Sequence, residues 1–344
     1  MQDILQRLNP VWNDSGLAYK ESVCFIEENG SITAGTYYAA EKIISLTSAD
    51  ETVEYVLGED YLFEDGRLVL TANSRIPYFT QAELYPSEAT EKSYGGKDPI
   101  PLVIFGEGTF FHSYQCSVTY LHSDTWRGDL PQVGAYRLKR TSSILQNGDP
   151  LKLLVYGDSI PAGGNASGCT GIEPYQPAFG ELIAEGIREK CGCEVECINT
   201  AVGGTATPWA LEEVEERAVR HHPDLAIIAF GMNDGSGNIP PQDFRNNIKG
   251  IIDAIRRESP DCEFILFSSI LPNAESCLAR IQGEYPPVLR SLEDRGVVLA
   301  DMYSVHAELL SAKRYIDMTG NNVNHPNDYV HRVYAQIALC ALGI

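Results

Sequence analysis

The chain has 344 residues, with 26 Lys and Arg against 47 Asp and Glu, so its formal net charge is −21. A surface this acidic repels phosphate backbones and anionic lipid headgroups, which argues against nucleic-acid binding and electrostatic membrane attachment. The apolar content of 44% is too high for a disordered chain. No apolar run approaches the roughly 18 residues that a membrane-spanning helix requires.

The number of cysteines and the first residues of the chain indicate the cellular compartment of the protein. The nine cysteines are odd in number and scattered along a long chain, which argues against a disulfide framework. The opening residues contain no basic stretch followed by an apolar one, so the sequence predicts no export signal. Both observations favour a reducing, cytoplasmic location. At roughly 150 residues per domain, the length predicts about two domains.

The first part of the chain, from about residue 22 to residue 139, has short apolar stretches separated by turn residues. The Asp65-Gly66 pair between two such stretches is a strong hairpin signal. Short strands with few helical patterns predict an antiparallel β-sandwich of jelly-roll-like type. The strands are expected at 23–26, 54–57, 61–63, 68–70, 102–105 and 116–121.

After Asn147 the sequence pattern changes to apolar strands that alternate with amphipathic helices. This alternation predicts βαβ units and a parallel sheet covered on both faces. We therefore expect a β-sandwich domain at 1–147 and an α/β domain at 148–344. The expected strands are 151–156, 195–199, 225–230, 264–268 and 297–300, and the expected helices are 179–191, 209–220, 244–257 and 288–295.

Polar residues and glycines follow the strands of this second half. Ligands of a doubly wound sheet bind outside the carboxyl ends of its strands, so these positions are candidates for a site. Ser159 follows the first strand on a tight turn, and Gly203-Gly204 follow the second. Asn233 follows the third strand, and His325 lies in a polar loop before the last helix.

Together these four blocks resemble the SGNH, or GDSL-type, hydrolase family, over residues 151–344 and in the family's order. The resemblance implies a flavodoxin-like doubly wound sheet in which Ser159 is the nucleophile and His325 the base. It implies an oxyanion hole made of the backbone N–H of Ser159, the backbone N–H of Gly204 and the side-chain amide of Asn233. No metal or organic cofactor is expected.

The residue types suit this chemistry. A serine hydroxyl is a poor nucleophile until a base takes its proton, and the ordinary pKa of histidine, about 6.5, suits that task near neutrality. Attack on an ester carbonyl creates an oxyanion, which N–H donors aimed at that position stabilise. Glycine at position 204 leaves room for substrate, and the amide of Asn233 donates without a proton that is easily lost.

One position departs from the family pattern. Asn322 stands where the family usually has an Asp, three residues before the histidine. Its neutral amide could orient the ring of His325, but it cannot stabilise an imidazolium by charge. Three alternatives remain open. A backbone carbonyl holds His325 in a Ser-His dyad, Asp317 or Asp328 supplies the carboxylate from another position, or the site is inactive. The first alternative is favoured.

Other interpretations of the same residues are weaker. Ser159 alone would be read as a helix cap, and Asn233 with its neighbours as an ordinary turn. The segment after the first strand lacks the Lys of a phosphate-binding loop, and a mononucleotide site would leave Asn233 and His325 without a role. Cys191, Cys193 and Cys197 match no zinc spacing, so no metal is expected.

The first domain contributes a segment rich in aromatic and polar residues, 106–112, followed by Tyr114, Tyr120 and Trp126. These rings either form the sandwich core or face the cleft. A β-sandwich before such a hydrolase domain is similar to the arrangement of family 2 carbohydrate esterases. The resemblance implies a serine esterase that deacetylates a small acylated substrate, most simply an acetylated sugar. A longer-chain ester or thioester hydrolase and a non-catalytic carbohydrate-binding protein are the alternatives. The oligomeric state stays open.

Overall fold

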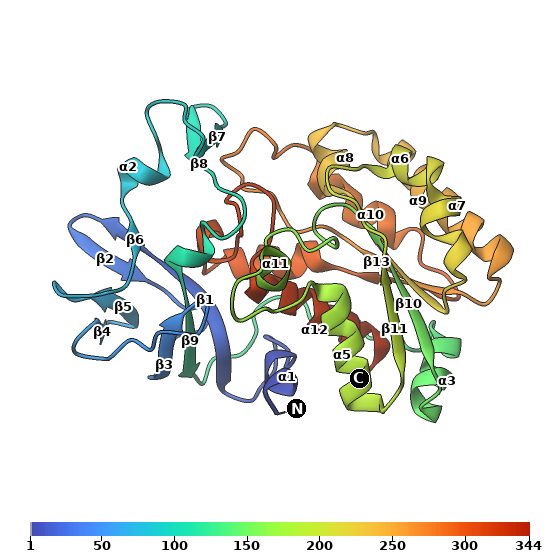
Figure 1. The fold of residues 1–344 in the computed structure, drawn as a ribbon, viewed down its shortest axis with the longest axis horizontal. Coiled ribbons are helices and arrows are strands. Elements are labelled where there is room, and N and C mark those ends of the chain that lie inside the picture. The colour runs from blue at the N-terminus through green and yellow to red at the C-terminus, as the bar shows by residue number, and fades with distance from the viewer. Residues whose placement is uncertain (1) are drawn as a thin grey trace.

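Two large β-sheets organise the computed structural model, which describes residues 2–344 (Figure 1). The first sheet comes from the N-terminal third of the chain and has seven strands, in the order β3-β9-β1-β2-β5-β4, with β6 beside β1. All of its pairs are antiparallel except β1 with β6. Its strands are β1 (Leu17–Glu28), β2 (Ser31–Ala34), β3 (Lys42–Ser48), β4 (Tyr61–Glu64), β5 (Arg67–Leu70), β6 (Tyr78–Phe79) and β9 (Gln115–Leu121).

Strand β1 joins the two parts of this sheet. Its first residues pair with β9, and its last residues pair with β2 and β6. The expectation of a strand-rich, antiparallel first half is confirmed, and the jelly-roll-like arrangement stays a prediction. A separate two-stranded sheet, β7 (Ser93–Gly95) with β8 (Leu102–Ile104), follows before β9.

The predicted hairpin and the predicted strand before it had different outcomes. Asp65 and Gly66 connect β4 to β5 with φ of 50° and 75°, as a two-residue hairpin turn requires. The strand expected at 54–57 is wrong, because this segment forms only isolated bridges at its two ends. The carboxylate of Asp60 accepts the backbone N–H of Val56 at 2.8 Å and so holds the segment in a turn.

The second sheet is parallel and has five strands in the order β11-β10-β12-β13-β14. The second strand of this half therefore lies outside the first, which is the doubly wound order that the sequence predicted. Strands β12, β13 and β14 are buried along their whole length, as expected for a sheet covered on both faces. The strands are β10 (Leu151–Gly157), β11 (Val195–Asn199), β12 (Leu225–Ala229), β13 (Glu263–Phe267) and β14 (Val297–Ala300).

Helices cover both faces of the parallel sheet (Figure 1). Apolar residues of α5 (Phe179–Cys191), α11 (Met302–Leu310) and α12 (Asp328–Leu342) pack on one face, and those of α9 (Pro241–Glu258) and α10 (Tyr285–Arg290) pack on the other. The single helix expected at 209–220 is wrong. The chain instead forms α6 (Thr207–Glu212), α7 (Val214–Arg217) and a 3₁₀ turn. The helix expected at 288–295 begins earlier, at Tyr285, because Pro286 and Pro287 suit a first helical turn.

The two halves share one hydrophobic core. Buried Val23 and Tyr120 of the first sheet belong to the same apolar cluster as Val155 of the parallel sheet and Val330 of α12. Helix α3 (Lys139–Asn147) precedes the predicted boundary at residue 147 yet packs beside β10 and α5. The chain has therefore already crossed to the parallel sheet before that boundary, which stays a prediction.

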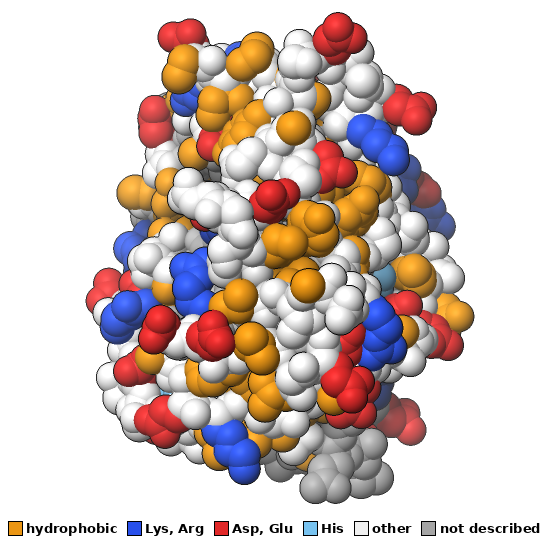
Figure 2. Space-filling view, turned by 90° about the vertical axis from the view of Figure 1, so that its left-hand side faces the viewer, with side chains coloured by type: hydrophobic (Ala, Val, Ile, Leu, Met, Phe, Trp, Pro, Cys, Tyr) orange, Lys and Arg blue, Asp and Glu red, His pale blue; other side chains and the backbone are white. Residues whose placement is uncertain are grey.

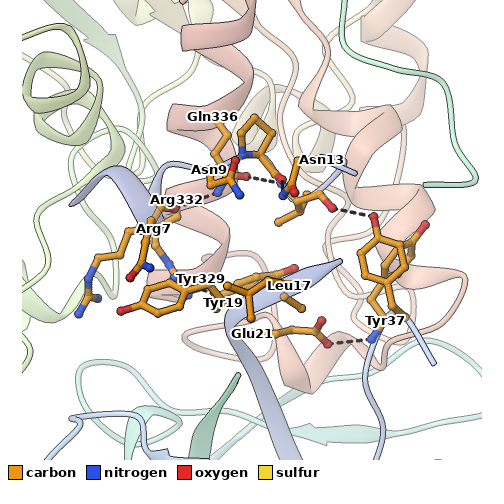
Figure 3. A pocket seen from close by; sticks show the side chains of 15 residues that line it. Arg7, Asn9, Asn13, Leu17, Tyr19, Glu21, Tyr37, Tyr329, Arg332 and Gln336 are labelled. Carbon is orange, nitrogen blue, oxygen red and sulfur yellow. Dashed lines mark hydrogen bonds between the residues drawn. The ribbon is translucent and has the colours of Figure 1, made fainter. Parts of the chain in front are cut away.

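A pocket lies where the N-terminal segment meets β1 and α12 (Figure 3). The side chain of Gln336 accepts the backbone N–H of Val11 at 3.1 Å and donates to the carbonyl of Arg7 at 3.0 Å. Glu21 accepts the backbone N–H of Tyr37 at 2.8 Å. The two bonds of Gln336 attach the start of the chain to its last helix, so we interpret the pocket as part of the junction between the halves.

The outer face of the first half carries apolar side chains among charged ones (Figure 2). The exposed large apolar residues of the first half include Ile44, Val56, Leu57 and Tyr78. Within residues 2–344, none of the helices combines the length and the apolar character needed to cross a bilayer.

Candidate active site

The end of strand β10 presents Ser159. A Cβ atom on Gly157 would lie 2.2 Å from the carbonyl oxygen of Ala229, so only glycine lets β10 and β12 approach this closely. The backbone N–H of Asp158 donates to the same carbonyl at 3.2 Å and extends the pairing by one residue. Ser159 then lies on the turn that follows, half-buried at the carboxyl edge of the sheet.

The loop before α12 brings His325 to this serine. The hydroxyl of Ser159 lies 2.9 Å from Nε2 of His325, although 166 positions separate the two residues. The loop is shaped by Asn321, whose Oδ1 accepts the backbone N–H groups of Val323, Asn324 and His325, each at 3.0 Å. One buried amide thus fixes the backbone that carries the ring.

The other ring nitrogen of His325 contacts Asn165. Oδ1 of Asn165 lies 2.7 Å from Nδ1, and Nδ2 of the same amide donates to the carbonyls of Gly108 and Gly320, each at 3.1 Å. Because the two carbonyls require the amide nitrogen on their side, the amide oxygen faces the ring. Nδ1 therefore carries the proton, and Nε2 is free to accept the proton of Ser159.

A carboxylate from the first half of the chain also lies at this ring. Oε2 of Glu107 is 3.3 Å from Nδ1 of His325, and Oε1 accepts Nδ2 of Asn321 at 2.9 Å. The side chain of Glu107 is 51% exposed. Partial burial raises the pKa of Glu107, but the hydrogen bonds and charge of His325 and the amide of Asn321 outweigh burial and lower this pKa overall. Glu107 is therefore ionised at neutral pH.

The three residues expected to orient His325 point elsewhere. Asn322 has a φ of 62° and donates to the carbonyl of Ile104 at 3.1 Å. Asp317 accepts the backbone N–H of Cys24 at 2.8 Å, which ties its loop to β1. Asp328 accepts the backbone N–H of Ser167 at 2.8 Å. The favoured alternative, a Ser-His dyad held by a backbone carbonyl, also differs from the structure. Nδ1 of His325 faces a side-chain amide and not a backbone carbonyl.

The glycine loop after β11 lies beside Ser159. The backbone N–H groups of Thr200 and Val202 donate to the carbonyls of Val155 and Gly157 at 2.9 and 3.0 Å, so the loop crosses the end of β10. A Cβ atom on Gly203 would lie 3.6 Å from Cβ of Ser159. The structure thus brings the second block of the motif against the first.

The oxyanion hole stays a prediction, and the surroundings of its three expected donors can be described. Gly204 has a φ of 78°, a left-handed conformation that favours glycine. Nδ2 of Asn233 donates to the carbonyl of Thr205 at 2.8 Å, which ties the third block to the glycine loop and leaves its second N–H for another acceptor. Among residues 2–344, no acceptor for the backbone N–H of Ser159 or Gly204 is found.

Sequence reasoning missed Asn165 and Glu107. Asn165 was detectable as a polar residue six positions after Ser159, but Glu107 lies 218 positions from the histidine. The aromatic residues near Glu107 are mostly core. Phe111 and Tyr120 are fully buried, and Trp126 packs against Tyr37 with ring centroids 5.0 Å apart.

Comparison with known proteins identifies the family. Residues 155–333, more than half of the chain, match the GDSL-like lipase/acylhydrolase family. The chain belongs to this family. Among curated proteins, this GDSL-family chain is similar to an arylesterase of Vibrio mimicus, with 31% identity over 105 residues, or 30% of this chain and 48% of that protein. The chain thus aligns with about half the length of this relative.

A solved structure shares the fold over part of the chain. The GDSL-family chain is similar to a two-domain esterase (CEX) active on acetylated mannans, with a TM-score of 0.50 and 20% identity over 63% of this chain and 55% of that one. It is also similar to Axe2, an acetylxylan esterase from Geobacillus stearothermophilus, with a TM-score of 0.48 and 16% identity over 56% of this chain and 94% of that one.

Proposed function

We propose that this GDSL-family chain is a serine ester hydrolase that removes acetyl groups from acetylated sugars or oligosaccharides. The observation that carries the proposal is the 2.9 Å contact between Oγ of Ser159 and Nε2 of His325 at the carboxyl edge of the sheet. The Asn165 contact supports it, because it keeps Nε2 unprotonated and ready to accept the hydroxyl proton.

The reaction proceeds in two halves. Oγ of Ser159 attacks the acetyl carbonyl while Nε2 of His325 takes the hydroxyl proton, and the same proton then passes to the leaving sugar oxygen. Water next attacks the carbonyl of the acetyl-enzyme while Nε2 takes one of its protons, and this proton passes to Oγ of Ser159 as acetic acid leaves. The backbone N–H groups of Ser159 and Gly204 and the amide of Asn233 stabilise the oxyanion of both tetrahedral intermediates.

The surroundings of the site favour a polar substrate. Glu107, Asn165 and Asn321 lie around the histidine, and the exposed Gly203 and Gly204 lie on the serine side. A long acyl chain would leave these polar groups facing hydrocarbon, which is unfavourable. The net charge of −21 also favours a neutral ligand over an anionic one. An acetylated sugar meets both requirements.

The proposal is tested with p-nitrophenyl acetate and with acetylated xylo- and manno-oligosaccharides. We expect turnover by the purified chain and loss of at least about 10³-fold in kcat for Ser159→Ala, since the nucleophile is then absent. Equal turnover by both proteins would overturn the assignment of Ser159. A chain-length series of p-nitrophenyl esters tests the substrate class, because sustained activity beyond about four carbons would favour a longer-chain hydrolase.

A further inference from the structure

We infer that Glu107, a residue of the N-terminal half, supplies the negative charge that stabilises the imidazolium of His325 during catalysis, while Asn165 orients the ring. This inference rests on the proposed function, since it assigns a role within the same reaction. It means that the carboxylate of the site comes from the other half of the chain.

The geometry divides two tasks between two side chains. Asn165 is the closer partner of Nδ1, at 2.7 Å against 3.3 Å for Glu107, so the ring N–H is directed mainly at the amide. An amide fixes direction and tautomer but carries no charge. Glu107 brings the charge within 3.3 Å of the same nitrogen, where a positive charge develops when Nε2 accepts the serine proton.

Asn321 holds the carboxylate of Glu107 in place. Asn321 donates Nδ2 to Oε1 of Glu107 at 2.9 Å, and its Oδ1 holds the backbone of His325 at 3.0 Å. A single asparagine therefore connects the carboxylate to the loop that carries the histidine. This arrangement keeps the carboxylate of Glu107 beside the ring of His325 although its side chain is half-exposed.

The backbone around Glu107 is attached to the same site. The carbonyl of Ile104, at the end of β8, accepts Nδ2 of Asn322 at 3.1 Å. The carbonyl of Gly108 accepts Nδ2 of Asn165 at 3.1 Å. Segment 104–108 thus makes hydrogen bonds with two residues of the histidine loop, with His325 itself and with the residue that orients the ring. The position that holds Asp in the family holds Asn322 here, and its side chain now anchors the segment that carries the replacement carboxylate.

The expected loss of activity in a Glu107 variant follows from the exposure of the Glu107 side chain. A half-exposed ion pair is partly screened by water and salt, so its charge contributes less than a buried carboxylate would. We expect Glu107→Gln to lower kcat for p-nitrophenyl acetate about two- to fivefold at low salt, with KM nearly unchanged, because the charge acts only where the imidazolium forms. The difference in kcat between the wild type and Glu107→Gln should decrease as the NaCl concentration rises. The substrate is neutral, so salt acts only on the enzyme's own charges.

Two controls separate charge from structure. Glu88→Gln makes the same change at an exposed residue of the same half and should leave kcat unaltered. Asn165→Ala should lower kcat by a factor that salt does not change, because it removes orientation and not charge. Circular dichroism and Tm of every variant verify folding.

The outcomes distinguish this inference from the proposed function. If Ser159→Ala abolishes turnover but Glu107→Gln matches the wild type at low salt, this inference is overturned and the esterase proposal stands. A loss in Glu107→Gln that is the same at low and high salt also overturns it, since the residue would then act only as a structural link to Asn321. Turnover that does not depend on Ser159 overturns both.

Discussion

Gly164 lies against the ring of His325, so closely that a Cβ atom at this position would be 3.1 Å from Nδ1 and 3.2 Å from Cε1. The same atom would be 2.9 Å from the carbonyl oxygen of Ser159, which is backbone and cannot swing away. Gly164 is not among the residues with positive φ, so its backbone does not demand glycine. Glycine is required at this position because the space beside the histidine ring has no room for a Cβ atom.

Gly164→Ala is therefore expected to displace the histidine ring. A shift of about 1 Å in a catalytic group lowers rates by up to about 100-fold, and we expect kcat to fall in that range. Steady-state kinetics with p-nitrophenyl acetate measure the effect. Gly35→Ala is the matched control, because a Cβ atom there would meet open space, with nothing within 4 Å, and its φ is not positive. Unchanged kcat in Gly164→Ala would contradict the packing described for the ring.

Asn233 is expected to contribute to the oxyanion hole. Replacing it with Ala removes the amide donor and should lower kcat by about 10²- to 10³-fold. Asn233→Asp has nearly the same shape but places a negative charge beside the developing oxyanion, so its loss should be at least as large. A change confined to KM in both variants would count against this role.

Asp158 predicts a pH dependence of stability. Burial raises its pKa to about 7, despite the hydrogen bond from the backbone of Ile160. An unfolded Asp titrates near pH 3.9. Between about pH 4 and pH 7 the folded chain therefore holds a proton that the unfolded chain has released, so this group lowers stability as pH rises through that window.

Asp158→Asn removes this penalty, since an amide oxygen still accepts the N–H of Ile160. The free energy of unfolding of the variant relative to wild type should therefore increase from pH 5 to pH 8, as measured by urea unfolding. Asp129→Asn, at an exposed residue, serves as the control and should show no such trend. A constant difference between Asp158→Asn and wild type would argue that Asp158 is ionised throughout.

A buried ion pair joins the two halves of the chain. Nζ of Lys313 lies 2.6 Å from Oε1 of Glu21, with the two side chains 0% and 4% exposed. Lys313→Met leaves a buried carboxylate without its cation and should reduce the free energy of unfolding by about 3–5 kcal/mol. The double variant with Glu21→Gln should lose much less, because no unpaired charge remains. Additive losses in the double variant would show that the pair is not coupled.

Local sequence signals predicted much of the second half. Ser159, Gly204 and Asn233 each lie within five residues of the end of a strand, so a correct strand assignment was enough to place them at one edge of the sheet. His325 could be placed at the same edge because the resemblance to the SGNH family pairs it with Ser159. The five parallel strands are unambiguous in sequence because they are apolar runs bounded by polar turns.

The partners of the histidine were not predictable in the same way. Asp317 and Asp328 are near His325 in sequence, but their carboxylates accept backbone N–H groups of Cys24 and Ser167. Glu107 lies in the loop after β8, in the other half of the chain, and no local pattern indicates which distant loop will cover a site. The mistaken strand at 54–57 has a different, local cause, because the hydrogen bond from the backbone of Val56 to Asp60 outweighs β propensity.

The continuous apolar cluster that runs from Val23 through Val155 to Val330 bears on how the molecule unfolds. Separating the halves would expose apolar surface on both of them at once, which opposes independent melting. The predicted domain boundary near residue 147 would then give no separate transition in calorimetry, and we expect a single cooperative endotherm in place of two. An excised segment 148–344 would also be prone to aggregation, since the face that normally contacts the first sheet would meet solvent.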